Sequence, residues 1–348
     1  MVKNDLAMKT LLVLFSVASS VNVLGMQPVA AKDAPTLLGQ GAHTYRWQKN
    51  WLQLPPGMTV GQTHGDVVID QKGQVIFSTD TKNAIVVANP AGRIVNVWGH
   101  NLGGGSHGLR LAKEGKQEVL WVASLKRHAA IKFSLDGKEL LSIGNPTANA
   151  MYAKADEFVP TALDVAPNGD VYVVDGYGKG WAHRFAANGQ WISSWNGSES
   201  SAGAFKTPHG VGIDLRGPEP RVVVADRANH RLQLFTLEGK FVSEVTEGLR
   251  LPSKIVTQGD SLLVVDLEGR VSIFDKDYKV VAQVGDNEDP KLRGVYDVPP
   301  DQWKDGQFTA PHGAAWDKQG NMYVQDWNSH GRMSKLIRVR SRTAAVNR

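Results

Sequence analysis

Three histidines in this sequence share a setting that suits metal binding. His107, His209 and His312 are each followed by a glycine and an apolar run, in the motifs Ser-His-Gly or Pro-His-Gly. Imidazole is a favoured zinc ligand, and three protein ligands with one open position form the arrangement of catalytic zinc sites. The three histidines are far apart in the sequence, so a zinc site requires a fold that brings them together.

A sequence repeat with the pattern of short strands and glycine-rich turns occurs six times and predicts a fold that can bring the histidines together. One copy is too small to bury its own apolar face, and copies arranged radially protect one another's strand edges. The predicted fold class is therefore all-β, a six-bladed β-propeller. Aligned on their proline or glycine and their apolar run, the copies have these residues at the first position: Gly65, His107, Thr161, His209, Ser253 and His312.

Histidine takes this first position in every second copy, in blades 2, 4 and 6. Alternate blades of a six-fold ring stand a third of a turn apart, so the three imidazoles are expected to meet in the central channel. His64 lies one residue out of this register. An alternative stays open, in which Pro-His-Gly is simply how the repeats begin. Each imidazole would then bond to a neighbouring carbonyl and hold no metal.

The two ends of the chain differ from the repeats. A basic residue precedes the apolar run Leu11–Leu24 and small residues follow it, which indicates a secretory signal peptide; the run is too short for a stable membrane span. A strand at Tyr45–Leu54 is expected to close the last blade, and the insertion Asp286–Thr309 to cross one face as a loop. The expected segments are a signal peptide (1–31), a flexible leader (32–43), the propeller (44–340) and a basic tail (341–348).

The composition limits location and chemistry. The 348-residue chain has no cysteine, which excludes disulfides and thiol catalysis; with the leader, this predicts a periplasmic or secreted protein. The net charge of +5 comes mainly from residues 332–348, so the body is about neutral and nucleic-acid binding is not expected. A small-molecule or peptide substrate is expected, and a protein partner stays open.

Two other repeated features are expected to be structural. An aspartate follows the second strand in most blades and is expected to cap a turn through its carboxylate. Tryptophans end two outer strands and are expected to wedge between blades. The residues are Asp175, Asp226, Asp266 and Asp326, and Trp98 and Trp195.

Four motifs add a resemblance to a known family: Ser106-His107-Gly108-Leu109, Asp175-Gly176-Tyr177, Pro208-His209-Gly210 and Pro311-His312-Gly313. Over about residues 60–340 the chain resembles NHL-type six-bladed propellers. These include the peptidyl-α-hydroxyglycine α-amidating lyase, which splits a peptidyl-α-hydroxyglycine into peptide amide and glyoxylate. The resemblance implies zinc on His107, His209 and His312, with Tyr177 as the catalytic base. A phenol titrates near pH 10, so it needs a nearby cation to act as a base at neutral pH.

The chain departs from that family at two places. Thr79 stands where the lyase has an arginine, and Lys82, Arg127 or Arg227 are the alternatives; His64 is a further candidate for contact with substrate or ligands. The lyase also holds a structural calcium through an aspartate after the blade 6 histidine, where this chain has Gly313. The resemblance then implies calcium on the set Asp66, Val67 and Leu109, with a carboxylate from blade 1 and two backbone carbonyls.

Two hypotheses from different classes follow. The first is an exported zinc-dependent lyase that cleaves the C–N bond of a peptidyl- or N-acyl-α-hydroxyglycine to an amide and glyoxylate. The second is a non-catalytic NHL propeller that binds a protein, peptide or glycan, with the histidine cluster structural. A lactonase-like hydrolase ranks third, because those propellers resemble one another in a carboxylate- and asparagine-rich calcium site, whereas the positions in register here are histidines.

Overall fold

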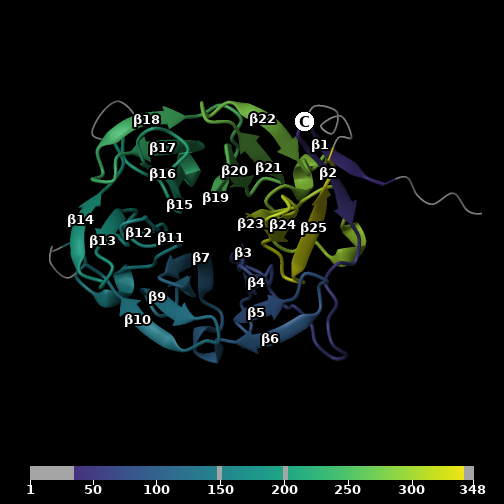
Figure 1. Ribbon diagram of the computed structural model, residues 1–348, viewed down its shortest axis with the longest axis horizontal. Helices are drawn as coiled ribbons and strands as arrows, with labels where there is room; N and C mark the ends of the chain where they lie inside the picture. The colour runs from purple at the N-terminus through teal and green to yellow at the C-terminus, as the bar shows by residue number, and fades with distance from the viewer. Residues whose placement is uncertain (1–34, 147–150, 199–202, 341–348) are drawn as a thin grey trace, which may run out of the picture. The chain divides into compact units, whose positions relative to one another are not determined.

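The computed structural model describes residues 35–146, 151–198 and 203–340, and these form a six-bladed β-propeller (Figure 1). The predicted signal peptide and basic tail lie outside the described residues. Six antiparallel sheets surround a central channel, each with its first strand innermost. The predicted fold class is confirmed.

Each blade follows one repeat of the sequence. Blade 1 has β3 (Val67–Ile69), β4 (Val75–Ser78), β5 (Ile85–Ala88) and β6 (Ile94–Trp98), and blade 2 has β7 (Ser106–Glu114), β8 (Gln117–Ser124), β9 (Ala129–Ser134) and β10 (Glu139–Ile143). Blade 3 has β11 (Ala162–Val165), β12 (Val171–Val174), β13 (Ala182–Phe185) and β14 (Trp191–Trp195), and blade 4 has β15 (Pro208–Asp214), β16 (Arg221–Asp226), β17 (Arg231–Phe235) and β18 (Phe241–Val245). Blade 5 has β19 (Pro252–Gln258), β20 (Ser261–Asp266), β21 (Arg270–Phe274) and β22 (Val280–Val284).

Blade 6 joins the two ends of the propeller. Its sheet runs β23 (Pro311–Trp316), β24 (Met322–Asp326), β25 (Arg332–Arg338), β2 (His43–Gln48) and β1 (Leu37–Gln40). The N-terminal strand β2 pairs with the C-terminal strand β25, as predicted, which closes the ring with chain from both ends.

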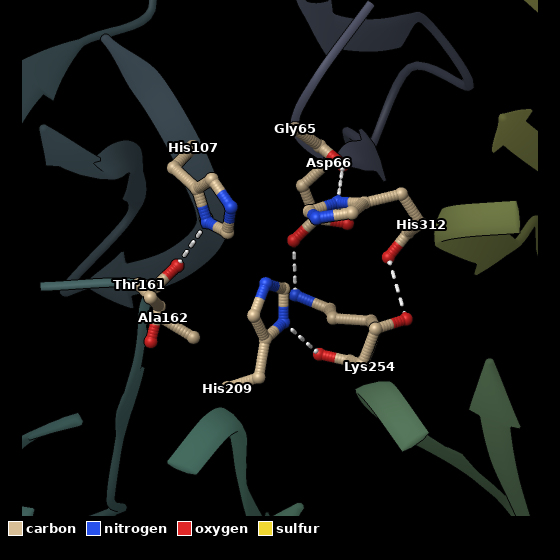
Figure 2. Close-up of a pocket in the computed structure, with 10 residues that line it drawn as sticks. Gly65, Asp66, His107, Thr161, Ala162, His209, Lys254 and His312 are labelled. Atoms are coloured by element: carbon tan, nitrogen blue, oxygen red, sulfur yellow. Dashed lines mark hydrogen bonds and ion pairs between the residues drawn. The ribbon is translucent and has the colours of Figure 1, made fainter. Parts of the chain in front are cut away.

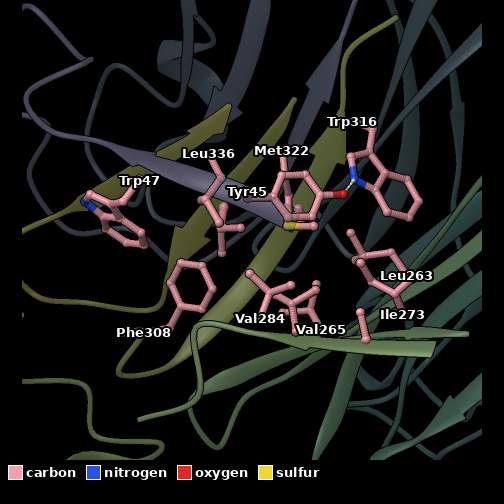
Figure 3. Close-up of a cluster of buried hydrophobic side chains, with 14 residues drawn as sticks. Tyr45, Trp47, Leu263, Val265, Ile273, Val284, Phe308, Trp316, Met322 and Leu336 are labelled. Carbon is pink, nitrogen blue, oxygen red and sulfur yellow. Dashed lines mark hydrogen bonds between the residues drawn. The ribbon is translucent and has the colours of Figure 1, made fainter. Parts of the chain in front are cut away.

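The structure corrects the predicted N-terminal boundaries. The closing strand ends at Gln48 rather than Leu54, and β1 lies in the stretch 32–43 that was predicted to be a flexible leader. Leu38 in β1 packs on the cluster that holds Tyr45 and Trp47 of β2 (Figure 3). The strand is short, mostly exposed and turned at Gly39 with a φ of +76°, so it has no clear alternation in the sequence.

The apolar core lies between neighbouring blades. Trp98 at the end of blade 1 packs on Phe133 of blade 2 with ring centroids 5.3 Å apart, and Trp195 of blade 3 packs on Phe235 of blade 4 at 5.7 Å. Wedged aromatics of this size contribute much of the burial between blades. The packing makes the ring a rigid frame for side chains in the channel.

The helices of the described chain are short 3-10 turns: His100–Leu102, Ala155–Glu157, Arg227–Asn229, Pro290–Leu292 and Pro300–Gln302. Across residues 35–146, 151–198 and 203–340, no helix has the length and apolar character that crossing a membrane requires.

Candidate metal centre

The three histidines in register meet in the channel. His107, His209 and His312 begin the innermost strands of blades 2, 4 and 6, and all three are buried (Figure 2). The centroids of their rings form a nearly equilateral triangle with sides of 4.7, 4.8 and 4.8 Å. Alternate blades thus bring together the imidazoles that the repeat alignment selected.

A β-bulge directs each of these side chains. The register between first and second strand shifts between Ser106 and Leu109, between Pro208 and Gly210, and between Pro311 and Gly313. The histidine lies inside each shift, where the extra residue bends the strand and can re-aim a side chain. Proline suits the first position of such a strand because it has no N–H to donate to the ladder.

The next blade fixes the tautomer of each imidazole. Nδ1 of His107 lies 2.6 Å from the carbonyl oxygen of Thr161, and the matching distances are 2.9 Å from His209 to Ser253 and 2.7 Å from His312 to Gly65 (Figure 2). A carbonyl oxygen only accepts, so Nδ1 carries the hydrogen and Nε2 presents its lone pair. This second interaction orients a ligand ring in the way that metal sites require.

Two of these lone pairs have nothing to bind. Within the described residues, Nε2 of His107 and Nε2 of His312 are buried and have no hydrogen-bond partner. A buried polar atom without a partner is costly, and such exceptions mark functional sites or an absent ion. The bond to a carbonyl that the metal-free alternative expects is present at Nδ1, but it leaves Nε2 unexplained. A metal ion bound there would satisfy both nitrogens.

Electrostatics keeps these rings neutral. Burial lowers the pKa of all three histidines well below the ordinary value of 6.5, and the charge of Arg227 lowers each pKa further. Neutral imidazole is the form that binds metal. The donor set therefore fits a metal ion near neutral pH.

The glycine after each histidine permits the close contact between blades. A Cβ at Gly108 would lie 2.7 Å from the Thr161 carbonyl oxygen, and a Cβ at Gly210 would lie 2.6 Å from that of Ser253. These oxygens are the acceptors of the Nδ1 hydrogens. The His-Gly pair therefore has a physical reason, since the ring and its acceptor meet only where the following residue has no side chain.

The repeated aspartates hold the segments that enter the innermost strands, whereas the sequence predicted that they cap a turn. Oδ1 of Asp326 accepts from the backbone N–H of Thr309 and Ala310 at 2.8 Å, just ahead of His312. Asp226 accepts from the N–H of Lys206 at 2.6 Å, just ahead of His209. Each carboxylate thus secures the backbone that places a histidine.

Tyr177 reaches the centre from blade 3. Its hydroxyl lies 3.1 Å from Nε2 of His209, to which it donates because that nitrogen carries no hydrogen. The side chain is 37% exposed, so a solute can approach it from solvent. The ring of Tyr177 thus lies beside two of the histidines, with centroids 5.3 Å from His107 and 5.5 Å from His209.

Arg227 is the basic candidate that the structure brings to the site. Its guanidinium lies 5.5 Å from the centroid of the Tyr177 ring, and Nη1 donates to the phenol oxygen at 3.4 Å. Arg127 is bound to Glu139 through its two terminal guanidinium nitrogens, Nη1 and Nη2. Lys82 follows β4 and is exposed. Among the residues that the structure describes, its side chain contacts none of the histidines. The buried Thr79 bonds to Asn83 and shapes its own turn.

His64 lies closer to the centre than its register indicated. Its ring centroid is 4.7 Å from that of His107 and 5.1 Å from that of His312. Ligand nitrogens of these three histidines lie within 4.8 Å of one another. The side chain is 20% exposed, and Nδ1 is 3.6 Å from a carboxylate oxygen of Asp80. A fourth imidazole is therefore available beside the His107–His312 edge of the triangle.

A polar network that the sequence analysis missed supports the Tyr177 loop. Ser194, His183 and Tyr152 form a chain of hydrogen bonds that ends on the carboxylate of Asp175. That carboxylate also accepts from the backbone N–H of Lys179 at 2.7 Å. Burial lowers the pKa of His183 to about 3, so it stays neutral. Tyr152 lies between β10 and β11, outside the repeated pattern of strands, so nothing in the sequence linked it to Asp175.

Sequence comparisons find relatives of the kind that the motifs indicated. The chain is 28% identical over 208 residues to human NHL repeat-containing protein 3, and the match covers 55% of this chain and 56% of that protein. It is 29% identical over 181 residues to peptidyl-α-hydroxyglycine α-amidating lyase 1 of Drosophila melanogaster, and this match covers 47% of this chain and 31% of the lyase. The matched stretch is thus about half of the first relative and about a third of the second. No family model matches the sequence.

A solved structure shares the fold. A streptogramin B lyase superposes with a TM-score of 0.55 at 16% identity, over 84% of this chain and 97% of that chain. At this identity the likeness concerns the propeller alone. The chain is therefore a six-bladed β-propeller whose relatives in sequence are NHL repeat-containing proteins and peptidyl-α-hydroxyglycine α-amidating lyases.

Proposed function

We propose that this protein is an exported, zinc-dependent lyase that cleaves the C–N bond of an N-acyl- or peptidyl-α-hydroxyglycine to an amide and glyoxylate. The observation that carries the proposal is the pair of buried, unpartnered Nε2 atoms of His107 and His312, next to a third imidazole, His209, whose Nε2 contacts the phenol of Tyr177. His107, His209 and His312 would hold the zinc, which supplies a Lewis acid for the substrate hydroxyl. The apolar run Leu11–Leu24 supports export to the periplasm or beyond.

The chain's own residues account for the movement of protons. Tyr177 acts as the base that takes the proton of the substrate hydroxyl, and the electron pair of that O–H bond forms the aldehyde carbonyl. The C–N bond breaks, its electrons pass to the amide nitrogen, and Tyr177 returns the proton there. No water or redox partner is consumed.

Arg227 is proposed to bind the substrate carboxylate. Its guanidinium already contacts Tyr177 from the side that is open to solvent. A guanidinium recognises a carboxylate through two parallel hydrogen bonds, which would orient the carbinol carbon towards the tyrosine. This assignment supplies the positive charge that the buried Thr79 lacks.

A second function is favoured by one observation, the approach of His64 to His107 and His312. Four imidazoles on one ion would close its coordination, and closed sites are structural. The propeller would then be a non-catalytic module for a protein, peptide or glycan, and the metal would strengthen the ring.

Glyoxylate release from N-benzoyl-α-hydroxyglycine tests the proposal. Metal-loaded protein is expected to form glyoxylate and benzamide in equal amounts, and removal of the metal should stop the reaction. Tyr177→Phe should retain the metal and lose at least about 100-fold in turnover. Tyr296→Phe is the matched control, because this tyrosine packs on Trp327 and, among the residues that the structure describes, its ring contacts none of the histidines. Metal-loaded protein that forms no glyoxylate would contradict the proposal.

His64→Ala separates the two functions. The lyase requires only three protein ligands, so the variant should keep one metal ion and its activity. A closed, structural site would lose much of its metal affinity in the same variant. The metal content of His64→Ala after dialysis therefore distinguishes an open from a closed centre.

A further inference from the structure

Two residues of opposite charge, Asp66 and Lys254, line the same pocket as the three histidines. The residue that follows the first position of each repeat is small in four blades and charged in the other two. Aligned around the ring, these residues are Asp66, Gly108, Ala162, Gly210, Lys254 and Gly313. Asp66 belongs to blade 1 and Lys254 to blade 5, the two neighbours of blade 6.

The two side chains meet in front of the glycine of blade 6. Nζ of Lys254 donates to Oδ2 of Asp66 (Figure 2). It also donates to the carbonyl oxygen of Leu109 at 3.1 Å. Asp66 also accepts from the backbone N–H of Val67 at 2.8 Å and of Leu109 at 3.1 Å. Asp66 is 3% exposed and Lys254 is 7% exposed. Such buried charges persist only when they are paired and hydrogen-bonded.

We propose that the Lys254 ammonium is the resident cation of this oxygen cage and that the cage does not bind calcium. The carboxylate of Asp66 and the carbonyl of Leu109 are two of the oxygens expected to hold calcium, and both accept from Nζ. Calcium takes six to eight oxygen ligands, whereas an ammonium group is satisfied by about three acceptors. One ammonium also neutralises one carboxylate, which leaves no net charge in a buried place. A divalent ion would have to share these oxygens with a cation.

Gly313 explains why the carboxylate comes from blade 1. A Cβ at position 313 would lie 2.6 Å from Cα and 2.7 Å from Oδ1 of Asp66. A side chain on blade 6 and the carboxylate of Asp66 therefore exclude each other. Gly313, Asp66 and Lys254 form one arrangement, in which the missing side chain makes room for an ion pair between the flanking blades.

The pair also links blades across the channel. Lys254 extends from blade 5 to a side chain of blade 1 and a carbonyl of blade 2. The preceding residue, Ser253, accepts from His209 through its carbonyl oxygen, and its hydroxyl donates to the carbonyl oxygen of His312 at 3.2 Å. Lys254 thus braces the segment that orients the histidines, in the place where a structural ion would do so.

Calcium titration of the metal-free protein tests this assignment without an activity assay. The melting temperature and the bound calcium are measured in 0–10 mM CaCl2 at constant ionic strength, for the native protein, Lys254→Ala and Lys254→Ala/Asp66→Asn. The native protein should bind no calcium and show no shift. Lys254→Ala leaves the Asp66 carboxylate without its cation, so its melting temperature should be lower and should rise with calcium to saturation. The double variant, which lacks the carboxylate, should not respond.

Two results would overturn the proposal. One is a calcium ion bound stoichiometrically by the native protein. The other is a Lys254→Ala variant whose melting temperature responds to calcium no more than that of the double variant. Should Lys254→Ala fail to fold, the calcium content of the native protein decides alone, and refolding of the variant with calcium but not magnesium would support the assignment.

Discussion

Replacing Gly210 by alanine tests the claim that close blade contacts hold the histidines. The added Cβ would lie 2.6 Å from the carbonyl oxygen of Ser253 and 3.2 Å from Cα of Lys254. That oxygen accepts from Nδ1 of His209 at 2.9 Å. The methyl group therefore strikes the atom that fixes the tautomer and orientation of one ligand ring.

The size of the effect follows from these distances. An ordinary van der Waals contact requires the carbonyl to retreat by about 0.8 Å, which would stretch the hydrogen bond to as much as about 3.7 Å, beyond its useful range. Overpacking costs about 1–3 kcal/mol and a lost hydrogen bond about 1 kcal/mol, so the free energy of unfolding should fall by about 2–4 kcal/mol. Loss of a partner that orients a metal ligand lowers metal affinity by about 10- to 100-fold.

Urea denaturation and competition with a zinc chelator measure the two quantities. Gly144→Ala is the matched control, because a Cβ at Gly144 meets no atom within 4 Å. The control should change stability by less than about 0.5 kcal/mol and leave metal affinity alone. Equal stability and equal metal affinity in the two variants would refute the argument that the glycine after the histidine positions the ring.

Three further predictions concern pH, capping and substrate binding. Burial lowers the pKa of His107, His209 and His312, and that of His183 to about 3, so the unfolded chain binds more protons below pH 6.5. The free energy of unfolding of the metal-free protein should therefore keep its maximum above pH 6.5 and fall below that pH by up to about 1.4 kcal/mol per pH unit for each histidine. His183→Gln should remove the contribution of one histidine, so that the free energy of unfolding falls less steeply between pH 4 and 6. Asp326→Ala leaves the N–H groups of Thr309 and Ala310 unpaired and should cost about 2–5 kcal/mol in urea denaturation, whereas the exposed Asp136→Ala should cost little. Arg227→Ala should lower kcat/KM for N-benzoyl-α-hydroxyglycine by about 10- to 100-fold at unchanged metal content, and an unchanged kcat/KM would remove Arg227 from substrate binding.

The repeat pattern predicted the fold because every repeat has an apolar face that it can bury only against the neighbouring repeats. Alternating apolar residues and the glycine-rich turns located the first strands within a few residues, and the register of the repeats selected His107, His209 and His312. That register alone implied their convergence, since alternate blades of a six-fold ring aim at one axis. The N-terminal strand β1 escaped prediction because Leu38 alone anchors it to the core.

The remaining parts of the site depend on how side chains lie in three dimensions. His64 is one residue out of register, yet its ring packs on His107 and His312. Lys254 was overlooked although a signal existed, since it and Asp66 are the two charged residues in a ring of small ones. Among three basic candidates, Arg227 was separated from Lys82 and Arg127 by its contact with Tyr177. The spacing of residues in the sequence does not show which of these long side chains reaches the site.

The metal content of the purified protein tests the central claim most directly. Elemental analysis of the native protein should find one zinc ion per chain, and His209→Ala, which removes one imidazole of the triangle, should lose it on dialysis. A native protein without bound metal, or a His209→Ala variant with full zinc occupancy, would contradict a centre built from histidines of alternate blades.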